Sequence, residues 1–296
     1  MVSRLRGNDK PAFERIVLAL ALAAALALAG CASAPPPAGG MAFALMGDTP
    51  YSQQQANLLE SLIDELNAEP LAFVAHVGDI TSGRGPCGDE WLEARKRQFA
   101  RIRHPFVLLP GDNDWTDCHR EGLDPLQRLM KWRALFCVQV ALPGFVRQRG
   151  AHCENVRWES AGLVLVGVNV PGSNNNLGRT PQMDAEYAAR MREVFAWLDE
   201  ALARARGRDG LVVLLQANPF LEPRGGGPSG FDSLLEWLAR AAEQLPGKVI
   251  LVHGDTHRFR DDEPLPWLRR IEVWGSPHVR WLRARIAPEG LVIDGP

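Results

Sequence analysis

Residues 71–79, LAFVAHVGD, form a nearly continuous apolar run that stops at a glycine and a carboxylate. A short run of this kind is typical of a buried strand in a parallel sheet. Three further stretches repeat the pattern: 41–48 (MAFALMGD), 106–112 (FVLLPGD) and 248–255 (KVILVHGD). The four runs end in Asp48, Asp79, Asp112 and Asp255. Because ligands bind at the carboxyl ends of strands in open α/β sheets, the sequence predicts a binding site at this edge.

The four strand-end carboxylates predict a bound cation. Gathered at one edge without partners, they would repel one another and lose hydration. A metal ion is the simplest arrangement that makes such a cluster stable. Each aspartate could instead cap the helix after its strand, because Asp is a favoured N-cap residue. Four such ends together with Asp114 and His257 favour the metal site.

The composition is that of an ordinary globular protein. The chain has 296 residues, 46% hydrophobic and 23% charged, enough for one sizeable domain or two small ones. Its formal net charge is −2, and no long block of like charge occurs. Binding to nucleic acid normally requires a basic patch, so the charge balance gives no reason to expect a nucleic-acid partner.

The N-terminus predicts export and lipid attachment. Basic residues precede an apolar run, residues 16–29, that is too short to span a membrane comfortably. We interpret residues 1–30 as a signal peptide, because the sequence LAGC at 28–31 resembles a bacterial lipobox in which Cys31 receives the lipid. An uncleaved membrane anchor is the alternative.

The segment after the signal peptide indicates where the folded domain lies. Residues 31–40 are rich in Pro, Gly and Ala and predict an extended tether, followed by a single domain over residues 41–296. Alanine after Cys31 is compatible with sorting to the outer membrane in lipoproteins of this type. We therefore expect an extracytoplasmic domain, anchored by lipid to the bacterial cell envelope on its periplasmic face.

Four further cysteines predict disulfides. An even number of cysteines in an oxidising compartment favours two bonds, with three possible connectivities. We favour Cys87–Cys118, because each lies a few residues past a Gly-Asp strand end, on loops expected to be neighbours. The remaining pair is Cys137–Cys153. A cysteine-rich metal site is the weaker interpretation, because no pair has the close CxxC spacing.

Strands alternate with helices along the chain, which predicts a layered α/β domain. Helical spacing of apolar residues occurs over 53–67, 89–102, 124–136, 180–206 and 229–245. Two features depart from the alternation: an antiparallel pair at 156–159 and 163–170, and a C-terminal meander at 271–274, 279–286 and 291–293. We expect two packed mixed sheets flanked by helices, with the carboxylates on loops at one edge.

Five blocks of sequence resemble the calcineurin-like metallophosphoesterases. In order, they are GDTP at 47–50, GDI at 78–80, GDND at 111–114, QANP at 216–219 and GDTH at 254–257. The resemblance covers residues 41–287 and implies a four-layer α/β-β/α sandwich with a two-metal centre. It also implies hydrolysis of a small phosphoester, with attack by a metal-bridged hydroxide.

The family pattern assigns roles to residues at matching positions. By resemblance, the first ion is held by Asp48, Asp79 and His257. The second ion is held by Asp79, Asp112, Asp255 and either Asn218 or Gln216. Asp114 and Asn113 match the catalytic block. Because position 113 is not a histidine, a leaving-group proton would come from His119 or His253, or would be unnecessary for a good leaving group.

The chain departs from the family pattern at several ligands. Pro50 replaces a histidine of the first block, and Asn113 replaces the histidine that assists the leaving group. Asp112 and Asp255 replace an asparagine and a histidine, and the fourth block lacks its histidine. One or two divalent ions are expected, among Mn²⁺, Mg²⁺, Ca²⁺, Fe²⁺ and Zn²⁺. The oxygen-rich ligand set favours the harder ions over a zinc-selective centre.

Three functions compete on this sequence. The first is an extracytoplasmic, lipid-anchored, metal-dependent phosphoesterase. The second is a catalytically degenerate lipoprotein that keeps the fold for binding or scaffolding, suggested by Pro50 and Asn113. The third is a structural Ca²⁺ site in a protein of the cell envelope. We favour the first, because most of the replacements still offer oxygen to a metal.

Overall fold

The computed structural model describes residues 41–221, 227–287 and 290–294. These residues all belong to one compact unit, residues 39–296. The expected signal peptide, Cys31 and the tether lie outside the described residues. Within the part of the chain that the structure describes, no helix combines the length and the apolar character needed to cross a membrane.

The first of two sheets has five strands in the order β12-β11-β1-β2-β3. Its centre is parallel: β1 (Met41–Met46) pairs with β2 (Val74–His76), which pairs with β3 (Phe106–Leu108). On the other side, β11 (Leu282–Ala287) runs antiparallel to β1 and pairs with β12 (Gly290–Ile293). The three parallel strands therefore end side by side.

The second sheet has seven strands in the order β4-β5-β6-β7-β8-β10-β9. Its parallel centre consists of β6 (Leu163–Gly167), β7 (Gly210–Leu214), β8 (Val249–His253) and β10 (Leu268–Glu272). The antiparallel margins are β4 (Val146–Arg147), β5 (Val156–Ser160) and β9 (Arg260–Leu265).

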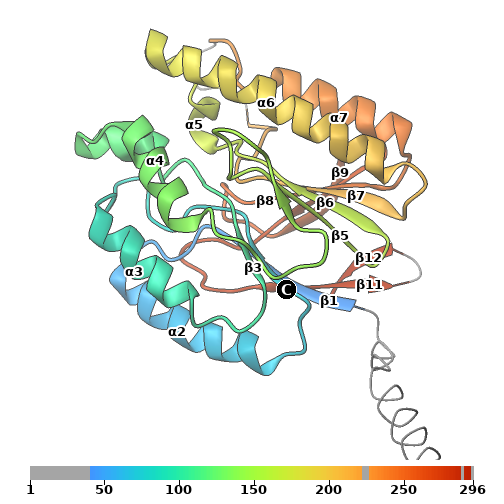
Figure 1. The fold of residues 1–296 in the computed structure, drawn as a ribbon, viewed down its shortest axis with the longest axis horizontal. Helices are drawn as coiled ribbons and strands as arrows, with labels where there is room; N and C mark the ends of the chain where they lie inside the picture. The colour runs from blue at the N-terminus through green and yellow to red at the C-terminus, as the bar shows by residue number, and fades with distance from the viewer. Residues whose placement is uncertain (1–40, 222–226, 288–289, 295–296) are drawn as a thin grey trace, which may run out of the picture. The chain divides into compact units, whose positions relative to one another are not determined.

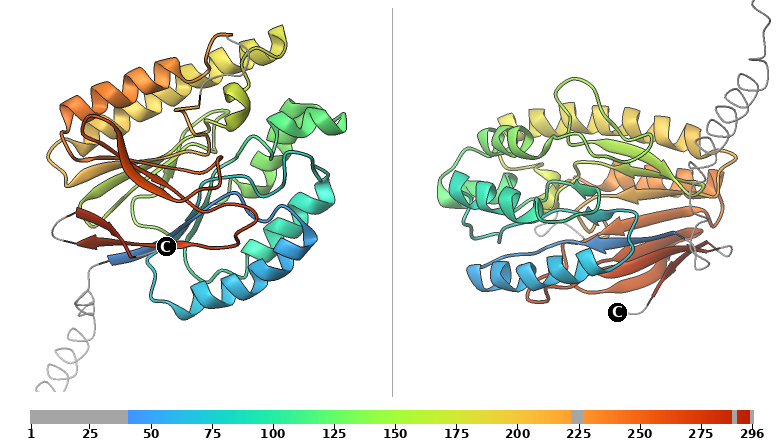
Figure 2. Two further views of the ribbon diagram at one scale, coloured as in Figure 1. Left: turned by 180° about the vertical axis from the view of Figure 1, so that it is seen from behind. Right: turned by 60° about the horizontal axis from the view of Figure 1, so that its bottom comes forward.

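Helices cover the outer face of each sheet, giving four layers (Figures 1 and 2). On the five-stranded sheet lie α2 (Gln53–Ala68), α3 (Asp89–Phe99) and α4 (Pro125–Phe136), which share one apolar core with it. On the seven-stranded sheet lie α6 (Pro181–Ala205) and α7 (Asp232–Gln244), which share a second core with it. A third core fills the space between the sheets. Each buried aliphatic or aromatic side chain contributes roughly 1.5–3 kcal/mol.

Helix starts follow the local sequence. The Ser52 hydroxyl accepts a hydrogen bond from the Gln55 amide at 3.2 Å, and Asp124 accepts one from the Leu126 amide at 2.8 Å, with Pro125 in the first turn. Such caps satisfy amides that the helix itself leaves without partners. The expected helices are therefore present, with the one expected to begin at 229 starting three residues later.

The sandwich is confirmed, but the expected C-terminal meander is wrong. The strand β10 lies in the seven-stranded sheet beside β8, whereas β11 and β12 extend the five-stranded sheet. Consecutive apolar runs do not reveal which sheet each strand joins. The strand β9, with sequence RDDEPL, was missed because it is an edge strand with exposed acidic residues and lacks an apolar pattern.

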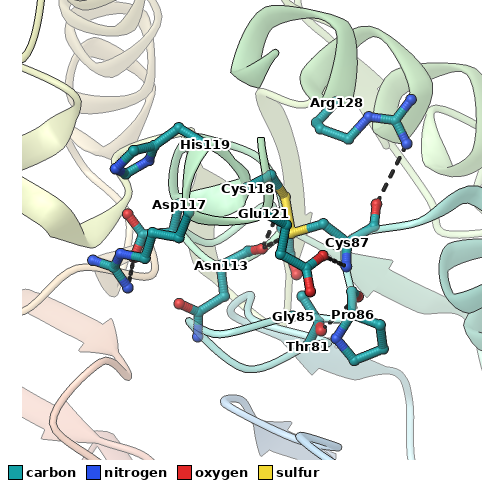
Figure 3. The surroundings of a disulfide bond; sticks show 12 residues. Thr81, Gly85, Pro86, Cys87, Asn113, Asp117, Cys118, His119, Glu121 and Arg128 are labelled. Atoms are coloured by element: carbon teal, nitrogen blue, oxygen red, sulfur yellow. Dashed lines mark hydrogen bonds and ion pairs between the residues drawn. A yellow bond between two sulfur atoms is a disulfide. The ribbon is translucent and has the colours of Figure 1, made fainter. Parts of the chain in front are cut away.

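Both expected disulfides are present. Cys87–Cys118 joins the loops that follow β2 and β3, and Cys137–Cys153 joins the end of α4 to the segment before β5. The first bond lies beside Asn113, the residue after Asp112 (Figure 3).

Candidate metal centre

The four strand-end aspartates meet where the two sheets face each other. Three follow β1, β2 and β3 of the first sheet, and Asp255 follows β8 of the second. The Asp255 amide donates to both oxygens of Asp48, at 3.0 and 3.1 Å. The Asn113 amide donates to Asp79 Oδ1 at 3.0 Å. The sandwich thus gathers residues that are more than 200 positions apart in the chain.

Four of the expected metal ligands have strained backbones. Asp48, Asp79, Asp255 and His257 have positive φ values of 50°, 62°, 77° and 60°. Non-glycine residues adopt this left-handed conformation rarely, and it persists at functional sites where the surroundings impose it. A side chain on Gly254 would overlap the Asp48 carboxylate, because its Cβ would lie 2.0 Å from Oδ2. The backbone is therefore shaped to bring carboxylates together.

The clustered carboxylates are mostly buried and have no lysine or arginine side chain as a partner among the described residues. Asp48 is fully buried and Asp79 is 2% exposed. Burial, and then repulsion from Asp255, raises the pKa of Asp48 well above its usual range. Burial, and then repulsion from Asp112, raises the pKa of Asp79 in the same direction. Among the described residues, no Lys or Arg forms an ion pair with these carboxylates.

Tyr51, which the sequence reasoning missed, lies at the middle of the first expected ligand set. Its hydroxyl is 2.9 Å from Asp79 Oδ2, 3.4 Å from Asp48 Oδ1 and 3.1 Å from His257 Nε2. The Asn113 side-chain amide also donates to this hydroxyl, at 3.0 Å. The run DTPY at 48–51 offered a signal, since Tyr51 directly follows the Pro50 that stands in place of a histidine ligand.

His257 is oriented as metal-binding histidines are. Its Nδ1 lies 2.8 Å from the Ser276 carbonyl and donates to it, which leaves a lone pair on Nε2. Two carboxylate oxygens and this lone pair then surround one hydroxyl, which has a single proton to give. The excess of acceptors around Tyr51 is what a cation would satisfy.

The second expected ligand set is less complete. Ser173 Oγ donates to Asp112 Oδ2 at 2.7 Å, and the Asn218 backbone amide donates to Asp255 Oδ2 at 2.9 Å. The Asn218 side chain is turned away, with its oxygen accepting from the Phe220 amide at 3.2 Å. Gln216 presents its amide nitrogen to Asp79 Oδ2 at 3.1 Å. The fourth block therefore offers hydrogen-bond donors where the family pattern has a histidine.

Asp114 and His253 take structural positions. The Asp114 carboxylate accepts from the backbone amides of Gly111, Asp79 and Ile80, at 2.8 to 3.1 Å. It therefore fixes the loops of the second and third blocks to each other. His253 is fully buried in β8, its Nδ1 donates to the Gly254 carbonyl, and burial lowers its pKa to about 3. Neither residue lines the pocket described below, so this geometry gives no support for a catalytic role.

Ser173 is a second residue that the sequence reasoning missed. The polar loop after β6 contains α5 (Gly172–Asn175), and residues 173–176 all have positive φ, between 49° and 67°. The buried Arg190 guanidinium holds this left-handed turn by donating to Asn175 Oδ1 at 2.7 Å and to the Asn175 carbonyl at 3.0 Å. The run of asparagines was a signal, because Asn tolerates this conformation.

A pocket of about 840 Å³ opens over the cluster. Asp79, Asp112, Asp255 and His257 line its floor, and Leu177 and Phe231 lie on its wall. Arg120 lines it as well, from the 3₁₀ helix η2 (Thr116–Glu121). Figure 3 shows how the Cys87–Cys118 bond ties the loop after β2 to this short helix, close to Asn113. The sulfur atoms of both cysteines lie 3.5 Å from the Asn113 carbonyl oxygen.

The residues present fit a metal ion with mainly oxygen ligands. Asp48, Asp79, His257 and the Tyr51 hydroxyl surround the first position, and Asp112 and Asp255 border the second. The ligand atoms are more widely spaced than in a closed site. In the described ranges, the one compact group of three such atoms is Cys137, Cys153 and Glu154, whose two sulfurs already form a disulfide.

Solved structures share this fold. A dimetal phosphatase from Danio rerio aligns with a TM-score of 0.58 and 13% identity, over 87% of this chain and 96% of its own. The protein TT1561 of Thermus thermophilus aligns with a TM-score of 0.51 and 11% identity, over 86% of this chain and 99% of its own. At such identities the likeness concerns the fold alone. No curated protein sequence matches the chain.

The family follows from sequence and fold together. The profile of the calcineurin-like phosphoesterases matches residues 41–259, which include all five blocks and every expected ligand. Phosphoesterases of this family generally use one or two divalent metal ions. The acid cluster between the two sheets lies where these blocks converge. The chain belongs to the calcineurin-like phosphoesterase family.

Proposed function

We propose that the protein is an extracytoplasmic, lipid-anchored hydrolase that cleaves small phosphoesters with one or two divalent ions. The observation that carries the proposal is the excess of acceptors around Tyr51 Oη, where Asp48, Asp79 and His257 converge on a single proton. Buried carboxylates that repel one another are stabilised by a cation. The family and the pocket above the cluster support the same conclusion.

Ions bound here would polarise the phosphoryl group and lower the pKa of a water molecule. The residues of this chain have separate tasks. Asp48, Asp79 and His257 would hold the first ion, together with Tyr51, and Asp112 and Asp255 would hold the second. Asn113 keeps Asp79 in place through two hydrogen bonds, at 3.0 and 2.8 Å. Gln216 restrains the same carboxylate from the opposite sheet.

The pocket offers no second imidazole to protonate a leaving group. Of the histidines in the described ranges, His257 alone lines the pocket. The His119 Nδ1 atom lies 2.9 Å from the Thr116 carbonyl within its own 3₁₀ helix. We therefore expect the enzyme to favour substrates with leaving groups that need little protonation, such as phenols, over simple alcohols.

Metal content and turnover, measured on the same samples, test the proposal. We expect purified protein loaded with Mn²⁺ to retain one or two ions per chain by elemental analysis and to hydrolyse p-nitrophenyl phosphate. Asp79→Asn should lose both properties together, because Asp79 lies between the two ligand sets. Asp64→Asn is a control, since Asp64 is exposed on α2, pairs with Arg101 and does not line the pocket. Wild-type protein that binds ions without hydrolysing any phosphoester would contradict the proposal.

One observation favours a second candidate, a metal-free binding lipoprotein. Asp79 Oδ2 already receives hydrogen bonds from Tyr51, Asn113 and Gln216, at 2.9, 2.8 and 3.1 Å. Three protein donors on the carboxylate expected to bridge two ions could replace the ions. Protein that retains no Mn²⁺, Mg²⁺, Ca²⁺, Fe²⁺ or Zn²⁺ after dialysis would support this candidate.

The location is tested separately. We expect Cys31 to carry the lipid, so cells labelled with a palmitate analogue should give a labelled protein in the outer-membrane fraction. Cys31→Ser should abolish the label and release the protein from the membrane. A labelled Cys31→Ser variant would contradict the anchor.

A further inference from the structure

Among the described residues, one positively charged side chain lines the pocket above the acid cluster. Four aspartates line it, namely Asp79, Asp112, Asp117 and Asp255, whereas Arg120 is the one Lys or Arg among its described lining residues. A phosphoester carries negative charge into this acidic space. Bound metal ions would offset the charge on the floor, but they leave the wall around Asn113 to the protein. Arg120 lies on that wall.

The Arg120 guanidinium is held in place by its neighbours. Its Nη1 is 2.7 Å from Asp117 Oδ2 and donates to the Gly83 carbonyl at 2.9 Å. Its other N–H groups have no partner in the described ranges, and its side chain is 46% exposed. An arginine fixed at one nitrogen, with the rest of its planar fork open, is suited to bind a phosphoryl group.

The guanidinium lies beside Asn113, where the family pattern has its leaving-group histidine. Arg120 Nη1 and Asn113 Oδ1 both face Gly83: a Cβ on that glycine would lie 2.8 Å from each atom. Any larger residue at position 83 would separate the two side chains. Asn113 in turn donates to Asp79 Oδ2 at 2.8 Å. Asn113 therefore separates Arg120 from Asp79, one of the expected metal ligands.

The surrounding charges leave Arg120 available to an anion. Two guanidinium groups share one carboxylate, since Arg179 Nη2 lies 3.6 Å from Asp117 Oδ1 and Arg120 contacts Oδ2. Arg179 also donates to the Thr116 carbonyl at 2.7 Å and does not line the pocket. Two guanidinium groups therefore pair with Asp117, and Arg120 is the one of the two that lines the pocket. Cys118 and Glu121, on either side of Arg120, are both tied to Cys87.

We propose that Arg120 binds the non-bridging oxygens of the substrate's phosphoryl group and makes the enzyme prefer phosphomonoesters to phosphodiesters. The inference rests on the proposed hydrolase function and names its substrate class. A monoester phosphoryl group is a dianion near neutral pH, whereas a diester carries one negative charge and has an oxygen blocked by its second alcohol. A charge-assisted fork therefore stabilises the monoester more strongly.

The test compares two substrates on matched variants of the Mn²⁺-loaded protein. For p-nitrophenyl phosphate, Arg120→Gln should lower kcat/KM by about 10- to 100-fold, the usual effect of removing a charge-assisted hydrogen bond. For bis(p-nitrophenyl) phosphate, the loss should stay below about threefold. The inhibition constant of inorganic phosphate should rise at least about tenfold, and Arg120→Lys should give intermediate values because lysine keeps the charge but not the fork.

Arg179→Gln is the matched control, because it removes the other guanidinium that pairs with Asp117, and Arg179 itself does not line the pocket. It should leave the monoester-to-diester ratio unchanged, and thermal unfolding of both variants separates a folding defect from a binding defect. Equal losses on both substrates, or an unchanged phosphate inhibition constant, would overturn the assignment of Arg120 while leaving the hydrolase intact. Wild-type protein that hydrolyses neither substrate would instead remove the proposed function, and the inference with it.

Discussion

The two sheets bring different chemistry to the centre. The five-stranded sheet contributes Asp48, Asp79 and Asp112, three carboxylates at the ends of three adjacent parallel strands. The seven-stranded sheet contributes one carboxylate, Asp255, and one imidazole, His257. It also contributes three neutral side chains, those of Ser173, Gln216 and Asn218. Most of the charge therefore comes from the first sheet. The hydrogen-bond donors that orient it come from both sheets, with Asn113 from the first and Gln216 from the second each donating to Asp79.

This difference predicts which residues of the proposed metal centre matter most. Removing a carboxylate from the first sheet takes away charge that a metal ion needs, whereas removing an amide from the second sheet takes away only orientation. Each prediction below compares a residue associated with the first sheet with its counterpart near the second. We give them from the largest expected effect to the smallest.

The largest difference is expected between Asp48→Asn and Asn218→Ala. Asp48 Oδ1 lies among the ligands around Tyr51, whereas the Asn218 side chain is already engaged with Thr256 Oγ1 and the Phe220 amide. Asp48→Asn should weaken Mn²⁺ binding by more than about 100-fold, because a buried charge partner is lost. Asn218→Ala should weaken it by less than about tenfold. Isothermal titration calorimetry measures both, and equal losses would break the comparison.

The disulfides should separate stability from activity. Cys87–Cys118 and Cys137–Cys153 span 31 and 16 residues, so removing either should lower the free energy of unfolding by about 3–4 kcal/mol. Only the first lies beside Asn113, so only its Ala double variant should also lower kcat/KM, by about fivefold or more. Urea unfolding and phosphoester assays give the two quantities. An inactive but stable Cys137/Cys153 variant would contradict this division.

Two strand-end histidines should respond to acid. Burial lowers the pKa of His76 to about 4 and that of His253 to about 3. In the folded protein both pKa values lie below the value near 6.5 of an unfolded histidine. The stability that depends on these neutral histidines is therefore fully present above pH 6.5 and is lost as the pH falls toward the folded-state pKa values. Each histidine should therefore remove about 2 kcal/mol from the free energy of unfolding between pH 7 and pH 5.

Leucine variants of the two histidines sharpen this contrast. His76 Nε2 donates to the Thr49 carbonyl at 2.9 Å and Nδ1 accepts from the Gly78 amide, whereas His253 Nε2 has no partner among the described residues. At pH 7, His76→Leu should therefore cost about 1–3 kcal/mol more than His253→Leu. Both variants should show a flatter pH dependence in urea titrations. A slope as steep as that of the wild type would show that the replaced histidine is not the titrating group.

The smallest expected effect concerns the two tyrosines of the chain. Tyr51 follows β1 at the centre, and Tyr187 on α6 donates to the Gly230 carbonyl at 3.2 Å. Tyr51→Phe should weaken Mn²⁺ binding by about tenfold if its oxygen is a ligand, and Tyr187→Phe should leave it unchanged. Calorimetric titration measures the change. Tighter binding in Tyr51→Phe would mean that the hydroxyl competes with the ion.

Much of the fold was accessible from sequence, because apolar runs and helix caps are local signals. The Gly-Asp ends predicted the strands that carry the four aspartates, and the positions of Cys87 and Cys118 predicted that their loops are neighbours. The sheet assignment of β10 and β11 was not predictable, because both are short apolar runs whose partners lie far away in sequence. The strand β9 carried no apolar signal at all.

The candidate site divides in the same way. The sequence by itself determined the family, the sandwich and the aspartates, since these depend on residue type at fixed places relative to strand ends. Only the tertiary structure decided that Tyr51, Ser173 and Arg120 face the pocket, and that Asp114 and His253 do not. Side-chain direction depends on φ, burial and partners contributed by the other sheet, and a linear pattern holds none of these.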